Sequence, residues 1–168
     1  KITREQLRVV AGVGERTARE FLSHRRRGKD FTSIVKLCDW HVPYHDEQAV
    51  DCAIRFCEKT QPDIILIDEI HDFYQLSRFN QDPKRQDVPQ EGKDIATGYF
   101  KRLKVACTGS RIILCSSNHL DRLRRFLWTD GQALSSLRCL QLEQLLQLPQ
   151  IGIEYAEDFE YKDVLFNH

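Results

Sequence analysis

Three short apolar runs alternate along the chain with two segments of helical character. The runs predict buried strands and cover residues 33–38, 64–67 and 111–115. Between them, residues 46–59 have apolar positions at helical spacing, and residues 92–107 are expected to form a second helix. This alternation predicts an α/β fold with right-handed crossovers and a mainly parallel, layered sheet with flanking helices.

The segments outside this central pattern are expected to be mostly helical. We expect a polar loop over 79–91 and helices over 3–10, 15–27, 120–128 and 133–147. Two short strands are expected after Ile151. The chain is therefore divided into a helical segment over 1–30 and an α/β body over 31–168.

Composition supports a globular protein. The 168 residues suit one domain with a small appendage, and hydrophobic residues make up 41% against 30% charged. No apolar run approaches the roughly 20 residues that span a membrane, so we expect no membrane contact and a cytoplasmic location. The six cysteines show no zinc-finger spacing and are expected to be reduced thiols.

Net charge is zero but unevenly distributed. Residues 1–30 hold nine basic and four acidic residues, so the body is mildly acidic. The segment 7–22 resembles the last two helices of a helix-turn-helix, with Arg16 and Arg19 facing DNA, and its Gly12-Val13-Gly14 turn also resembles a helix-hairpin-helix. Arg25, Arg26 and Arg27 would add phosphate contacts. An amphipathic helical pair packed on the body explains the segment equally well.

Each predicted central strand is followed by residues that can bind metal or transfer protons. Because active sites of such sheets lie beyond the carboxyl ends of the strands, these residues are expected to meet. If the chain stays extended after the first strand, Asp39 and His41 point to the same side. Oxygen and imidazole ligands together suit Mn, Fe or Zn better than Mg or Ca. The full set is Asp39, His41, Asp68, Glu69, Asp72, Asn118 and His119.

Three sequence blocks, at 39–46, 72–79 and 118–125, resemble the calcineurin-like metallophosphoesterases, most closely the phage and prophage type. The family pattern is Asp-x-His, Gly-Asp-x-x-Asp and Gly-Asn-His-Glu/Asp, then a later His and Gly-His-x-His, each at a strand end. The resemblance covers about residues 33–168. It implies an enzyme with two divalent metal ions, with Mn favoured and Fe or Zn as alternatives.

The resemblance also implies a role for each residue. Asp39 and His41 would hold one metal, Asp68 or Glu69 would bridge the two, and Asn118 would bind the other. His119 would protonate the leaving oxygen, and Asp72 would orient His119. His168 falls where the family's later ligand often follows a strand.

Several positions depart from the family pattern. Asp68-Glu69 stands in place of Gly-Asp, so either carboxylate is a candidate for the bridging ligand. Ser117 and Leu120 replace the glycine and the acidic residue that flank Asn-His in the family. No Gly-His-x-His is present, and the chain starts at Lys1 and contains no Met. We therefore expect the sequence to be part of a longer protein.

Three functions follow as hypotheses. The first is metal-dependent hydrolysis of a phosphomonoester or phosphodiester, with nucleic acid as one candidate substrate. The second is a catalytically degenerate phosphoesterase that acts as a DNA-binding or interaction module. The third is a nucleotide phosphatase. Among the remaining polar residues, His45 and Asp46 are expected to cap the following helix, and His71 is expected to face solvent or a water beside the metal ligands. Arg122, Arg124 and Arg125 either receive substrate phosphates or form a solvated helix face.

Overall fold

A computed structural model describes residues 32–82, 84 and 89–166. The predicted N-terminal helices lie outside the described residues, as do His168 and the five candidate DNA contacts Arg16, Arg19, Arg25, Arg26 and Arg27. Among the described residues, no helix combines the length and apolar character needed to cross a membrane.

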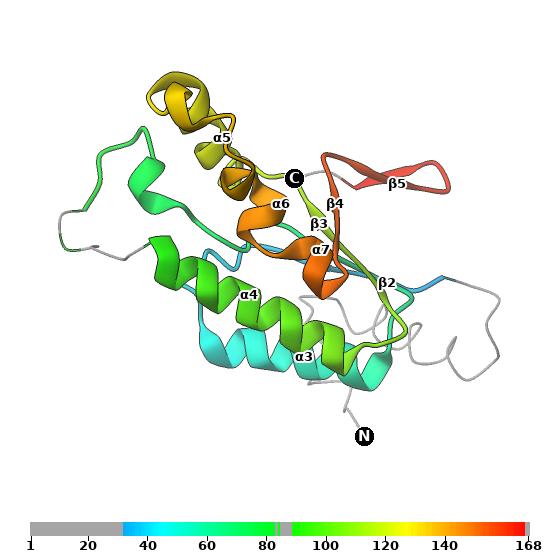
Figure 1. The fold of residues 1–168 in the computed structure, drawn as a ribbon. Coiled ribbons are helices and arrows are strands. Elements are labelled where there is room, and N and C mark those ends of the chain that lie inside the picture. Colours follow the sequence, from blue (N-terminus) through cyan, green and yellow to red (C-terminus); the bar gives the residue numbers. More distant parts are fainter. Residues whose placement is uncertain (1–31, 83, 85–88, 167–168) are drawn as a thin grey trace.

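The centre of the fold is a four-stranded parallel sheet in the order β1-β2-β3-β4. Its strands are β1 (Ile34–Leu37), β2 (Ile64–Ile67), β3 (Arg111–Cys115) and β4 (Glu154–Ala156). The long helices α3 (Glu47–Thr60) and α4 (Pro89–Ala106) connect the first three strands and pack side by side (Figure 1). The predicted α/β class and parallel sheet are confirmed.

Period-two alternation gives the sheet two different apolar faces. Val35, Leu37, Ile65 and Ile67 belong to the main core, which also holds the buried residues of α3 and α4. The intervening residues, including Ile64, Leu66 and Ile113, pack against Phe159. Phe159 belongs to an antiparallel hairpin made of β5 (Phe159–Tyr161) and β6 (Val164–Phe166). Helices therefore cover one face, and this hairpin covers part of the other.

The predicted helix over 133–147 is wrong. The chain there forms the 3₁₀ turns η2 (Gln132–Leu134) and η3 (Arg138–Leu140), followed by the short helices α6 (Leu142–Leu145) and α7 (Leu148–Ile151). Leu137 and Gln141 have extended ψ values of 115° and 138°, so the chain leaves the helical conformation twice within this segment. After Ile151 there are three strands instead of two, because β4 joins the main sheet before the hairpin.

Two further elements border the site. The 3₁₀ turn η1 (Tyr74–Leu76) follows β2, and α5 (Asp121–Thr129) follows β3 close to its predicted position. These two elements contact each other, although 45 residues separate Leu76 from Asp121. The six cysteines form no disulfide, as expected.

Candidate metal centre

The segments that follow β1 and β2 stay paired beyond the ends of the strands. His41 N donates to Glu69 O at 2.9 Å, and Val42 N donates to Ile70 O at 2.9 Å. Asp72 N then donates to Val42 O at 3.0 Å. This pairing holds His41 beside Glu69 and Asp72.

His41, Glu69 and His119 come together at the carboxyl ends of three adjacent strands. One ligand atom from each lies within 4.8 Å of the others. His41 Nε2 is 3.4 Å from Glu69 Oε2, and His119 Nε2 is 3.7 Å from Glu69 Oε1. The Glu69 side chain is only 4% exposed. A buried carboxylate thus faces two imidazole nitrogens.

Asp72 is close to the Nδ1 atoms of both histidines. Its Oδ2 is 3.1 Å from His41 Nδ1 and 3.3 Å from His119 Nδ1. A carboxylate in this position favours the tautomer in which Nδ1 carries the proton, and it leaves the Nε2 lone pair directed toward Glu69. The structure therefore places Asp72 beside His119, as the sequence analysis expected, and beside His41 as well.

Arg122 joins this group from the first turn of α5. Its Nη1 donates to the Asp72 backbone oxygen at 2.9 Å and to Asp72 Oδ1. Its Nη2 is 3.3 Å from His119 Nε2. From the sequence, Arg122 was expected only to receive substrate phosphates or to lie on a solvated helix face. The spacing of three residues between His119 and Arg122 is the sequence signal that could have placed these two side chains together at the start of a helix.

The environment lowers the pKa of His119. Burial is the largest cause, and the positive charge of Arg122 acts in the same direction, while Asp72 opposes it. A histidine with a lowered pKa is neutral at pH 7, so its free nitrogen is available as a ligand or a proton acceptor.

Asp68 and Glu69 face opposite sides of the sheet. Asp68 continues the alternation of Ile64 and Leu66, and Lys36 Nζ lies 2.9 Å from its Oδ2. Glu69 has a φ of 44° and turns toward the histidines. Of the two candidate bridging carboxylates, Glu69 is the one that the structure places with His41 and His119.

Asp39 lies at the edge of this group. The chain is not extended after β1, because Asp39 and His41 have φ values of 59° and 50°. The expectation that their side chains point to the same side required an extended chain and therefore does not apply. The Asp39 side chain is 66% exposed, and its Oδ1 is 3.8 Å from His41 Nε2. Its role as a metal ligand stays a prediction.

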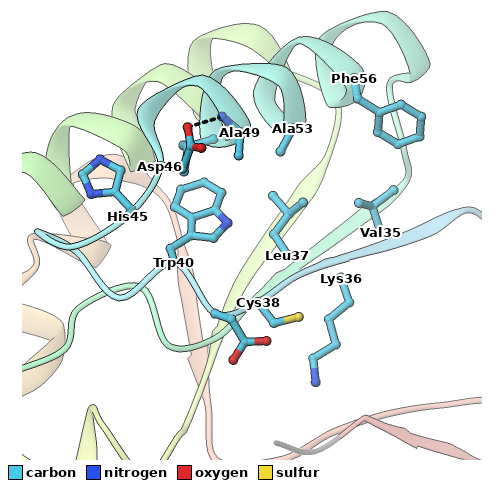
Figure 2. Close-up of a pocket in the computed structure, with 12 residues that line it drawn as sticks. Val35, Lys36, Leu37, Cys38, Trp40, His45, Asp46, Ala49, Ala53 and Phe56 are labelled. Carbon is cyan, nitrogen blue, oxygen red and sulfur yellow. Dashed lines mark hydrogen bonds between the residues drawn. The ribbon is translucent and has the colours of Figure 1, made fainter. Parts of the chain in front are cut away.

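Asp39 also lines a cavity of about 360 Å³ between β1 and α3, together with Cys38 and Trp40 (Figure 2). At the rim of this cavity Asp46 caps α3, as expected, by accepting hydrogen bonds from Gln48 N and Ala49 N. Although Cys38 is exposed, partial desolvation of its thiol and then the nearby carboxylates of Asp68 and Asp39 raise its pKa to about 11, so this thiol is not activated.

Two other expectations have different outcomes. Asn118 is exposed and lines a separate cavity between η1 and α5, and its role as a metal ligand stays a prediction. His71 does not face solvent: it is fully buried, stacks on Phe73 at 4.0 Å between ring centroids, and accepts a hydrogen bond from Phe73 N.

The three grouped residues fit a transition metal. Two donors bound to one ion at about 2.1 Å lie no more than about 4.2 Å apart. Each His–Glu distance, measured to a different Glu69 oxygen, is below that limit, and one ligand atom from each of the three residues lies within 4.8 Å of the others, so a small closing movement would complete the site. Two imidazoles and one carboxylate suit Zn, Mn or Fe better than Mg or Ca. Three protein ligands also leave coordination positions open, which is typical of catalytic sites.

Comparison with known proteins adds no relative: no family model, no curated protein and no solved structure matches the chain.

Proposed function

We propose that this chain is a metal-dependent phosphoesterase whose ion is held by His41, Glu69 and His119. The observation that supports this most is the meeting of these three residues at adjacent strand ends. His41 and His119 belong to sequence segments that resemble calcineurin-like metallophosphoesterases, and Glu69 stands three residues before Asp72, which is the family spacing. Eight non-glycine residues of the described chain adopt left-handed φ, and four of them, Asp39, His41, Glu69 and Phe73, belong to the segments that carry the group. Backbone strain of this kind often occurs at functional sites, so the observation agrees with the proposal.

Each residue of the group has a distinct task in this proposal. A bound divalent ion would supply Lewis-acid activation of water and of a phosphoryl oxygen. Asp72 Oδ2 shares a hydrogen bond with His41 Nδ1 and lies 3.3 Å from His119 Nδ1, a position from which it would orient both rings. Arg122 and an ion compete for the lone pair of His119 Nε2, so ion binding would move the guanidinium away from His119. There it can contact the charged oxygens of a phosphoester.

Hydrolysis of bis-p-nitrophenyl phosphate with added Mn²⁺ tests the proposal. We expect activity that EDTA removes and that Glu69→Gln lowers by about 100-fold or more, which is a typical magnitude for loss of a positioned catalytic group. His45→Gln is the matched control, because His45 bonds the Tyr99 hydroxyl outside the group. Absence of Mn²⁺-dependent hydrolysis, or full activity in Glu69→Gln, would contradict the proposal.

Arg122 also supports the alternative of a degenerate binding module. Its guanidinium already supplies a positive charge to Asp72 and His119, which is the charge that an ion would otherwise provide. In that case the group would hold together without metal. DNA binding in EDTA, combined with no hydrolysis of any phosphoester, would favour the module.

A further inference from the structure

A second cavity, of about 430 Å³, lies between α5 and the segment that contains η1. This volume is within the range of small-molecule binding sites. The lining residues that matter here are Arg78, Phe79, Asn118, Arg122, Arg125 and Phe126. We call this cavity the α5 groove.

The α5 groove is predominantly basic. Three arginines line it against one acidic residue, Asp130. The Arg125 side chain is 49% exposed. Within the described part of the chain it forms one ion pair, in which its Nη2 lies 3.6 Å from Asp121 Oδ2. Exposed guanidinium groups along a groove favour a ligand with more than one phosphate.

Two phenylalanines at the same groove are exposed to solvent. Phe79 is 82% exposed and Phe126 is 36% exposed. Apolar rings of this size are normally buried, so their exposure beside arginines indicates a ligand with flat apolar surfaces. Nucleobases have such surfaces and stack on aromatic side chains regardless of sequence.

Arg122 connects the α5 groove to the candidate metal centre. Its side chain lines the groove, and its guanidinium contacts Asp72 and His119. A polymer lying in the groove would therefore pass one of its phosphates beside the metal centre while its neighbouring phosphates and bases contact Arg125 and the two phenylalanines.

We infer that the α5 groove binds single-stranded nucleic acid, with Arg78 and Arg125 on its phosphates and Phe79 and Phe126 on its bases. This inference rests on the proposed phosphoesterase function, because it assigns the groove to the substrate of that site. It narrows the substrate to a phosphodiester within a nucleic-acid strand.

Fluorescence anisotropy with a labelled oligothymidylate of about ten nucleotides tests the inference on the full chain. EDTA is present, so that binding is measured without cleavage and without any ion. We expect Phe79→Ala to weaken binding roughly tenfold, the typical loss for one stacked base. The logarithm of the binding constant falls linearly with the logarithm of the salt concentration, with a slope of about −0.7 for each contacted phosphate of a single strand. We therefore expect Arg125→Ala to make this slope less steep by about 0.7.

Two control variants separate the groove from the rest of the surface. Trp128 is exposed on the same helix but lines a different cavity, so Trp128→Ala should bind as the unmodified chain does. Arg138 is exposed on η3 outside the groove, so Arg138→Ala should keep the salt slope. Equal losses in control and groove variants would overturn the inference.

Other outcomes identify a different ligand or a different site. Thymidine monophosphate that competes as well as the oligomer would overturn the inference in favour of a mononucleotide. Binding that is lost only when Arg25, Arg26 and Arg27 are replaced by alanine would place the contact on the N-terminal segment instead, which also overturns it.

The inference and the proposed function can fail separately. Mn²⁺-dependent hydrolysis of bis-p-nitrophenyl phosphate by a chain that does not bind the oligomer would overturn the inference alone. Oligomer binding that depends on Phe79 and Arg125, in a chain that binds no Mn²⁺, would support the groove assignment and overturn the phosphoesterase.

Discussion

Asp68 and Glu69 are neighbours in sequence, yet their carboxylates lie on opposite faces of the sheet. Sequence spacing could not choose between them, because the choice depends on the left-handed φ of Glu69. Strand alternation carries Asp68 to the hairpin side, where Lys36 neutralises its buried charge. Asp39 was similarly difficult to place: Asp and His adopt left-handed φ more often than most residues, but the residue type alone does not show that Asp39 and His41 both do so.

The role of His119 can be decided by one substitution. The sequence resemblance implies a proton donor, whereas its distance to Glu69 favours a metal ligand. If His119 binds the ion, His119→Gln should weaken Mn²⁺ binding by at least about tenfold, since even supporting residues contribute that much. Isothermal titration with Mn²⁺ measures this. Unchanged affinity together with a large loss of kcat would instead assign His119 to proton transfer.

Arg122 should influence the protonation of His119. Its positive charge is one of the causes that lower the His119 pKa, so Arg122→Gln should raise that pKa toward its ordinary value. Burial persists in the variant, so the pKa should stay below that of an exposed histidine. Titration of the His119 ring protons by NMR, in EDTA, measures the shift. A pKa that falls or stays constant would contradict the contact between Arg122 and His119.

At the scale of elements, the strands and long helices could be predicted because their patterns are strong and local. Residues 133–147 could not, although they are rich in leucine. Leu134, Leu137 and Leu140 recur every three residues, a spacing that also suits an α-helix, but the structure has two separate turns, η2 and η3, with an extended Leu137 between them. A longer helix would also have to pass Gln147 and Pro149.

Helix α4 contains two glycines whose substitution should have opposite effects. A Cβ on Gly92 would lie 2.8 Å from His71 Nε2, whereas a Cβ on Gly98 would meet nothing within 4 Å. We expect Gly92→Ala to lower the free energy of unfolding by roughly 1–3 kcal/mol through overpacking against the buried His71. Gly98→Ala should raise it by roughly 0.5–1 kcal/mol, because alanine favours a helix. Urea unfolding of both variants measures the difference, and equal effects would contradict the packing of α4 on His71.

At the scale of the whole molecule, the parallel sheet explains why residues far apart in sequence meet. Parallel neighbouring strands end at the same edge, so the residues after β1, β2 and β3 were expected to converge, and His41, Glu69 and His119 do. The α5 groove could not be predicted, because it depends on how α5 packs against η1. For Arg122 the sequence showed only its spacing from His119, and its contact with Asp72 became visible only in the fold. The two-metal assignment stays a prediction, since the role of Asn118 is untested and His168 lies outside the described residues.

Equilibrium binding of Mn²⁺, followed by the loss of its free-ion EPR signal, tests the metal centre most directly. We predict that the unmodified chain binds Mn²⁺ and that Glu69→Gln does not, while Asp68→Asn keeps the affinity because its carboxylate lies on the other face. Circular dichroism confirms that both variants are folded. Mn²⁺ binding that survives in Glu69→Gln and disappears in Asp68→Asn would contradict the proposed centre.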